Sequence, residues 1–197
     1  MNLAIIKYNA GNIQSVLNAL ERLGLQAAVT DDPEKIKAAD KVIFPGVGEA
    51  SSAMKSLQQN NLDKLIKELK QPVLGICVGM QLLCSHSEEN HTDCLGIVPI
   101  QVKKFAAQSA GLKVPQVGWN QIYHLQSDLF KNIGTNPFVY NVHSYYAEDS
   151  GYTIAKCLYG IEYAAAIKKD NFYGVQFHAE KSAETGDQII KNFLERT

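Results

Sequence analysis

Hydrophobic residues in the first half of the chain alternate between short continuous runs and helical spacing. The runs at residues 3–6, 25–29, 41–44 and 73–76 are typical of strands, and the last of them is wholly apolar. The helical spacing is clearest at Ile13, Val16, Leu17, Leu20 and Leu23, and again at Leu62, Leu65, Ile66 and Leu69. This alternation predicts βαβ units on a parallel sheet, with the apolar run at 73–76 near its centre.

Glycine, proline and aspartate mark the expected ends of these elements. Gly24 is a stop for the first helix, and Asp32 followed by Pro33 is a cap and first position of a short second one. We expect Pro45 and Gly46 to halt the third strand, and Pro72 to end the helix before the fourth.

The second half of the chain is rich in strand-like segments. They lie at 98–105, 114–124, 138–145, 152–159, 163–167 and 172–177, with a hairpin-like turn at 169–171. A last helix carries Ile189, Ile190, Phe193 and Leu194. With no linker, repeat or low-complexity tract in view, residues 1–197 are predicted to form a single α/β domain with an antiparallel extension.

Composition narrows the class of protein. The 197 residues include 19 Lys and Arg against 20 Asp and Glu, a net charge of −1 that gives no electrostatic signal for binding nucleic acid. The four cysteines include no CxxC pair, the start does not resemble a signal peptide, and no apolar run approaches the roughly 20 residues that span a bilayer. We therefore expect a cytoplasmic protein that binds neither nucleic acid nor membrane.

The strongest chemical signal is the segment Gly75-Ile76-Cys77-Val78-Gly79, which directly follows the apolar strand. G-x-C-x-G at this place is the thiol version of a nucleophile elbow, in which a strained strand-to-helix turn exposes one side chain. The start of the following helix would favour thiolate over thiol at Cys77. The alternative is a buried structural cysteine, which is common in protein cores.

A thiol nucleophile needs a base, and His178 is the best candidate among the five histidines. It lies at the end of a strand-like run, and Glu180 follows two residues later, close enough to orient the imidazole. The glycine-rich turn after the third strand, which contains Val47 and Gly48, could direct backbone N–H groups toward an oxyanion, with a second donor at Val78. It lacks the pattern of a phosphate loop.

Together these segments resemble the class I glutamine amidotransferases, a triad family with a flavodoxin-like α/β fold. The matching segments span nearly the whole chain in the family order and read YNAGN at 8–12, PGVG at 45–48, GICVGMQLL at 75–83, SEE at 87–89, PQVGWN at 115–120, VHSY at 142–145 and VQFHAEKS at 175–182. The GWN and PGVG segments resemble the branch serving histidine biosynthesis rather than relatives serving GMP, anthranilate or carbamoyl phosphate synthesis.

The resemblance implies a role for each matching residue and requires no cofactor or metal. Cys77 would attack the side-chain amide of glutamine, with His178 as acid and base and Glu180 as its orienter. The backbone groups of Val47 and Val78 would hold the oxyanion. The positions that match glutamine-binding residues of the family are Gly48, Gln81, Ser144 and Tyr145.

The resemblance also implies a partner that uses the ammonia, namely a separate (β/α)8-barrel cyclase subunit in a heterodimer. Trp119 is a candidate anchor for that interface, and the alternative is that it is an ordinary core residue. The other positions that match the partner-facing surface are Asn12, Asn120, Tyr140 and Lys181. Two departures from the family pattern are Ala179, where proline is usual, and the first loop at 7–9.

Several other interpretations remain open. Cys84, His86, His91 and Cys94 offer four zinc ligands within eleven residues, but their spacing is more cramped than in structural zinc sites. The chain could also be a binding protein that keeps the fold without turnover, a different cysteine hydrolase, or a paralogue that feeds another synthase, such as a sugar-modifying one.

Overall fold

A parallel five-stranded sheet forms the centre of the computed structural model, which describes residues 1–9, 12–106 and 112–197. The strand order is β2-β1-β3-β4-β13, and every neighbouring pair is parallel. The wholly apolar β4 lies between β3 and β13, as its sequence predicts. The bounds are β1 Leu3–Ile6, β2 Ala28–Thr30, β3 Lys41–Gly46, β4 Val73–Cys77 and β13 Phe172–Val175.

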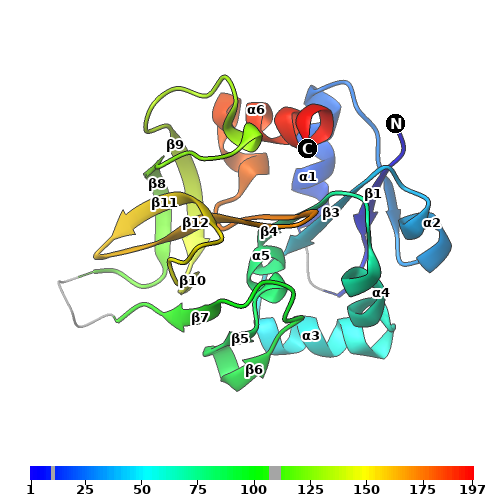
Figure 1. The fold of residues 1–197 in the computed structure, drawn as a ribbon, viewed down its shortest axis with the longest axis horizontal. Helices are drawn as coiled ribbons and strands as arrows, with labels where there is room; N and C mark the ends of the chain where they lie inside the picture. The colour runs from blue at the N-terminus through cyan, green and yellow to red at the C-terminus, as the bar shows by residue number, and fades with distance from the viewer. Residues whose placement is uncertain (10–11, 107–111) are drawn as a thin grey trace.

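Helices cover both faces of these parallel strands (Figure 1). Helices α1 and α6 lie on one side of the sheet, and α3, α4 and α5 lie on the other. The bounds are α1 Ile13–Arg22, α2 Pro33–Lys37, α3 Ala50–Gln59, α4 Leu62–Glu68, α5 Val78–Leu83 and α6 Ala183–Arg196, with short 3-10 turns η1 Glu89–His91, η2 Asp128–Phe130 and η3 Ala179–Lys181. None of the helices in the described ranges is long and apolar enough to cross a membrane.

Beyond β13 the sheet changes to largely antiparallel pairing. It continues through β12, β10 and β7 to the short strands β5 and β6, while β11 pairs with β12 and β8, and β8 pairs with β9. The bounds are β5 His86–Ser87, β6 Thr92–Asp93, β7 Gln101–Lys104, β8 Gln116–Tyr123, β9 Phe138–His143, β10 Tyr145–Ala147, β11 Thr153–Tyr159 and β12 Ile161–Lys169. The predicted α/β sheet with an antiparallel extension is confirmed.

The predicted cap of the second helix is present at the atomic level. Asp32 precedes α2, and its side chain accepts a hydrogen bond from the backbone N–H of Glu34 at 3.0 Å. Gly24 follows α1 with a positive φ of 71°, which glycine adopts at little cost. Large side chains then fill the space between sheet and helices, among them the fully buried Phe44, Phe177 and Phe193.

The structure differs from the predicted elements in several places. The third strand does not halt at Pro45 but runs to Gly46, because both residues stay in register with the neighbouring strand β4. The second strand begins at Ala28 rather than at residue 25. Helix α3 was not predicted, since the buried face of this helix is made largely of Ala50, Ala53 and Ser56, which give a weak apolar signal.

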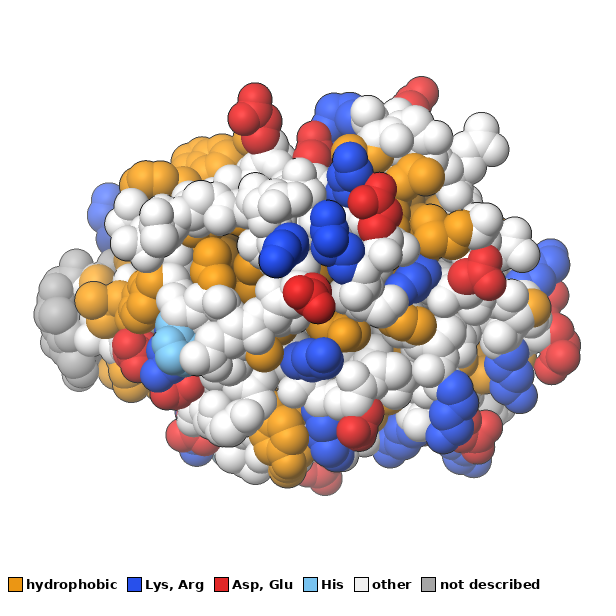
Figure 2. Space-filling view, turned by 45° about the horizontal axis from the view of Figure 1, so that its top comes forward, with side chains coloured by type: hydrophobic (Ala, Val, Ile, Leu, Met, Phe, Trp, Pro, Cys, Tyr) orange, Lys and Arg blue, Asp and Glu red, His pale blue; other side chains and the backbone are white. Residues whose placement is uncertain are grey.

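Charged side chains are spread over the surface. On the face in Figure 2, several basic side chains gather near the centre, but acidic side chains lie among them. This mixture agrees with the net charge of −1 and gives the face no single sign.

Candidate active site

Cys77 lies on the sharp turn from β4 into α5, where the glycine spacing of the sequence predicts a nucleophile. Its backbone has φ 53° and ψ −113°, a conformation that is unusual for any residue other than glycine. Strain of this kind persists only where the surrounding structure enforces it, and it is common at active sites. The turn therefore holds the thiol in a fixed position at the carboxyl end of the sheet.

Two glycines explain why the turn can be so tight. A Cβ atom added to Gly79 would lie 2.0 Å from the carbonyl oxygen of Phe44, and one added to Gly46 would lie 2.4 Å from the nitrogen of Gly79. Helix α5 thus packs with its backbone directly against the end of β3. Only residues without a side chain permit this approach.

His178 and Glu180 form a buried pair beside Cys77. His178 immediately precedes η3, and its backbone N–H donates to the carbonyl of Tyr140 at 2.9 Å. Its Nδ1 lies 2.7 Å from Oε1 of Glu180, and both side chains are almost fully buried. Ala179, which replaces the usual proline between them, does not separate the pair.

The surroundings of His178 favour its protonated form. Burial lowers the pKa of His178, but the hydrogen bonds to Cys77 and Glu180 outweigh burial and raise the pKa to about 10. Within the described residues, Oε2 of Glu180 is buried without a hydrogen-bond partner. His178 is therefore the hydrogen-bond partner of this carboxylate, which accepts from Nδ1–H and holds the imidazole ring in one orientation. The other ring nitrogen, Nε2, is then available to Cys77.

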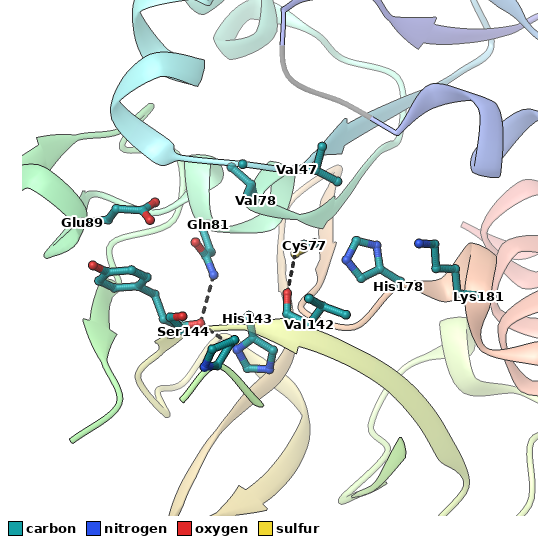
Figure 3. A pocket seen from close by; sticks show the side chains of 13 residues that line it. Val47, Cys77, Val78, Gln81, Glu89, Val142, His143, Ser144, His178 and Lys181 are labelled. Atoms are coloured by element: carbon teal, nitrogen blue, oxygen red, sulfur yellow. Dashed lines mark hydrogen bonds between the residues drawn. The ribbon is translucent and has the colours of Figure 1, made fainter. Parts of the chain in front are cut away.

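A cavity of about 370 Å³ opens in front of Cys77 (Figure 3). This volume is in the range of small-molecule sites. Glu180 lies behind His178, outside the lining. Every residue predicted to bind glutamine or to hold the oxyanion contributes to the lining, which consists of Val47, Gly48, Cys77, Val78, Gln81, Glu89, Pro115, Val142, His143, Ser144, Tyr145, His178 and Lys181.

The amide of Gln81 is already engaged within the protein. Its Nε2 donates to the carbonyl of Tyr145 and to Oε1 of Gln176, both at 3.0 Å. Both N–H groups are therefore used, and the oxygen of Gln81 is the atom left to accept a hydrogen bond from a ligand. Gln176 received no role from the sequence, although it stands two residues before His178.

Glu89 lines the cavity, and sequence reasoning left it without a role. It lies at the opposite end of the cavity from Lys181 (Figure 3). Its Oε2 accepts a hydrogen bond from the backbone N–H of Ala50 at 2.7 Å, and burial raises the pKa of Glu89. An acidic side chain near the free oxygen of Gln81 can bind an ammonium group. The sequence offered one signal for this role, namely the position of Glu89 in the SEE segment.

Another histidine in the lining has the opposite electrostatic character. His143 is buried, and burial lowers its pKa to about 4 despite a hydrogen bond from Nδ1 to the carbonyl of Tyr145 at 2.8 Å. His143 is thus neutral near pH 7, whereas His178 is protonated. The two histidines cannot exchange roles.

The residues predicted to face a partner lie outside the cavity or at its rim. Trp119 is 52% exposed and packs edge-on against Tyr140, so the alternative of a core tryptophan is wrong. Trp119 and Tyr140 pair across β8 and β9, and the neighbouring pairs on this face bring Val117 opposite Val142 and Gln121 opposite Phe138. We call Val117, Trp119, Phe138, Tyr140 and Val142 the β8–β9 face.

The other three predicted partner-facing residues lie in separate places. Asn120 is half-buried on β8, where its side chain donates to the carbonyl of Leu158 at 3.0 Å. Asn12 caps α1 by accepting from Ser15 N–H at 3.4 Å, and the preceding residues 10 and 11 of its motif lie outside the described residues. Lys181 is exposed at the end of the cavity nearest His178.

The suggested zinc ligands are not arranged around a common point. His86 pairs with Asp93 at 3.0 Å, while Cys84 is buried and its thiol donates to the carbonyl of Met80 at 3.7 Å. In the parts of the chain that the structure describes, no group of three or more His, Cys, Asp or Glu side chains could hold a metal ion.

Comparison with known proteins assigns the family. The profile described as "Glutamine amidotransferase class-I" matches residues 4–197. The chain belongs to the class I glutamine amidotransferase family, so the resemblance seen in the sequence is confirmed. It is 58% identical over 195 residues to the "Imidazole glycerol phosphate synthase subunit HisH" of Bacteroides fragilis strain YCH46, with 99% of this chain and 100% of the relative covered.

A more distant relative and two solved structures are consistent with this family. The protein of the same printed name from Idiomarina loihiensis is 44% identical over 197 residues, covering 100% of this chain and 99% of its own. Among solved structures, one described as a glutamine amidotransferase superposes with a TM-score of 0.76 at 16% identity, covering 99% of this chain and 98% of its own. PurLQS from Thermotoga maritima gives 0.71 at 16% identity, covering 98% and 97%. These two structures support the fold.

Proposed function

We propose that this chain is the glutaminase subunit of imidazole glycerol phosphate synthase, hydrolysing glutamine to glutamate and ammonia for histidine biosynthesis. The observation that carries the proposal is the Cys77–His178–Glu180 constellation at the end of a cavity whose other end holds a carboxylate. The names of full-length relatives at 44–58% identity support the histidine branch over a paralogue that feeds a sugar-modifying synthase.

The cavity suggests how glutamine binds. Its α-ammonium group would lie against Glu89 and the free oxygen of Gln81, and its side-chain amide would point to Cys77. Gly48, Ser144 and Tyr145 would contact the backbone part of the substrate. This orientation brings the amide carbon to the sulfur and leaves the substrate's charged end at the far side of the cavity.

The reaction follows from the geometry of Cys77 and His178. With a proton already on Nε2 of His178, Cys77 reacts as the thiolate and attacks the amide carbon while backbone N–H groups of Val47 and Val78 stabilise the oxyanion. The C–N bond then breaks, and the proton on His178 goes to the departing ammonia. A water molecule, deprotonated by the now neutral His178, hydrolyses the thioester to glutamate and restores the thiolate beside a protonated His178, with Glu180 orienting the imidazole throughout.

The partner in this proposal is a (β/α)8-barrel cyclase that forms a heterodimer with this chain in the cytoplasm. Ammonia would pass to N′-[(5′-phosphoribulosyl)formimino]-AICAR phosphate, giving imidazole glycerol phosphate and AICAR phosphate. The β8–β9 face supports this assembly because it is apolar and exposed, and because Val142 belongs both to this face and to the cavity. Asn12, Asn120 and Lys181 would add polar contacts.

The partner would also control the reaction. We expect the oxyanion donor at Val47 to point away from the cavity until the cyclase and its nucleotide ligand reorganise the PGVG turn. This arrangement would prevent the isolated chain from wasting glutamine.

The proposal is tested by measuring ammonia release from glutamine by the purified chain, alone and with the cyclase and its nucleotide ligand. We expect negligible release by the chain alone and a sharp rise in the complex. Cys77→Ala should abolish the release, whereas Cys94→Ala, at a half-buried cysteine outside the cavity, should not. Retained release in Cys77→Ala would refute the assignment of the nucleophile. Full release by the lone chain would refute the gating.

The same assay separates the alternatives. A binding protein would release no ammonia with any partner. A paralogue would release ammonia only with a different synthase, and another type of cysteine hydrolase would cleave substrates other than glutamine.

A further inference from the structure

A continuous series of buried hydrogen bonds ends at the sulfur of Cys77. Nε2 of Gln176 lies 3.8 Å from Sγ of Cys77, and Oε1 of Gln176 accepts from Gln81, which also donates to the carbonyl of Tyr145. Gln176 is completely buried. Its amide is therefore held between a donor on one side and the nucleophile on the other, where no bulk water competes.

The carbonyl oxygen of Tyr145 determines the direction of every bond in this series. A carbonyl can only accept, so Gln81 must present its NH2 group to Tyr145. The second N–H of Gln81 points to Gln176, which must accept the hydrogen bond with Oε1. The NH2 group of Gln176 is then the part of the amide that faces Cys77.

A second buried donor holds the same carbonyl. Nδ1 of His143 lies 2.8 Å from the oxygen of Tyr145 and must donate to it, which makes Nε2 of His143 an acceptor. The hydroxyl of Tyr163, which donates to Oε1 of Gln116 at 3.1 Å, lies 3.3 Å from that nitrogen. The carbonyl is thus fixed from two sides, and the Gln176 amide has one allowed orientation.

Besides His178, the sulfur of Cys77 has two contacts, which respond oppositely to ionisation. The Cys77 thiol donates to the carbonyl of Val142 at 3.9 Å, a bond that requires the thiol proton. The N–H of Gln176 donates to the sulfur, and a donor of this kind bonds more strongly to a thiolate than to a thiol. Gln176 therefore favours the form of Cys77 that attacks the substrate.

We propose that Gln176 is a further catalytic residue, a fixed donor that stabilises the Cys77 thiolate, and that Gln81 is the positioning residue that orients it. The role in turnover rests on the proposed function, whereas the effect on the thiol does not. The other titratable groups near the sulfur are His178, backed by Glu180, together with Tyr8 and His143.

The experiment measures the rate at which iodoacetamide alkylates Cys77 in the isolated chain as a function of pH, with the Cys77 peptide followed by mass spectrometry. Gln176→Met keeps the length of the side chain and removes the donor. We expect the midpoint of the pH profile to rise by about one unit, since a hydrogen bond to a charged group has roughly that effect. Gln176→Leu is measured in parallel, so that the result does not depend on the folding of one variant.

Two further variants separate this role from general stabilisation. Tyr163→Phe removes a buried hydroxyl that donates to Gln116 and lies beside His143 but does not touch Gln176, and we expect it to lower the melting temperature without moving the alkylation midpoint. Gln81→Met releases the Gln176 amide, so the midpoint should rise, and the double variant should shift no further than Gln176→Met.

An unchanged midpoint in folded Gln176→Met and Gln176→Leu would overturn the proposal. An equal rise in Tyr163→Phe would also overturn it, because the effect would then not be specific to the donor. Because the assay needs neither glutamine nor a partner, it remains decisive even if the chain releases no ammonia. In the active complex, the matching expectation is a shift in the pH profile of kcat/KM of the same size.

Discussion

Val142 contacts Cys77 from one strand position and also belongs to the exposed β8–β9 face. Its carbonyl oxygen accepts the hydrogen bond from the thiol at 3.9 Å, and 38% of the residue is exposed, opposite Val117 on the neighbouring strand. A protein bound to this face would therefore contact Val142, the same residue that is hydrogen-bonded to Cys77. The contact gives the interface a direct structural path to the site.

Trp119→Ala should weaken binding of the cyclase with little effect on the fold. Half of the tryptophan is exposed, so its removal leaves no core cavity, but an anchoring tryptophan at an interface typically contributes about 2 kcal/mol, or a roughly 30-fold change in the dissociation constant. Isothermal titration calorimetry measures the change. Val29→Ala, at an exposed valine on β2, is the control. Unchanged affinity in Trp119→Ala would place the interface elsewhere.

Glu89→Gln should raise the KM for glutamine far more than it lowers kcat. The carboxylate lies at the end of the cavity away from Cys77 and would bind the substrate's ammonium group, a charged hydrogen bond worth about 1.5–3 kcal/mol. We expect a rise in KM of roughly 10- to 100-fold in steady-state kinetics of the complex. Glu88→Gln is the matched control. The carboxylate of Glu88 accepts a hydrogen bond from Lys104 N–H and does not line the cavity. A loss confined to kcat would contradict this binding pose.

His143 should make the folded state less stable as the solution becomes acidic. Its pKa is lowered to about 4 in the folded chain, against about 6.5 when unfolded, so the unfolded chain takes up a proton first. The associated destabilisation is absent above pH 6.5 and grows to about 3 kcal/mol as the pH falls to 4.

Urea denaturation at a series of pH values tests this expectation. In His143→Gln, the fall in the free energy of unfolding between pH 6.5 and 4 should be smaller than in the natural sequence by about that amount. An identical pH dependence in both proteins would show that His143 is not buried in neutral form.

Ala179→Pro should leave ammonia release within about twofold of the natural sequence. The pair formed by His178 and Glu180 is already closed at 2.7 Å, and Ala179 is the first residue of a short helical turn, a position that tolerates proline. We expect the loss of backbone freedom in the unfolded chain to add about 0.4–1 kcal/mol to stability. Activity assays and urea denaturation measure the two effects, and a large activity loss would mean that the turn needs the freedom of alanine.

Local features of the sequence predict much of the site. The elbow at Cys77 and the pair His178 and Glu180 each occupy a few consecutive residues, so their spacing alone indicates their geometry. The position of Gln176 beside Cys77 and Gln81 could not be predicted in this way, because it depends on the register between β13 and β4. The outward direction of Trp119 likewise depends on how β8 pairs with β9.

The order of these residues along the chain has a consequence for synthesis. Gln176 lies 99 residues after Cys77, and His178 follows two residues later. A ribosome therefore completes the nucleophile and most of the parallel sheet long before the base and the thiolate donor are made. A nascent or truncated chain that lacks the last strand and helix would carry Cys77 without its base and without the thiolate donor, which keeps unfinished copies of the protein from consuming glutamine.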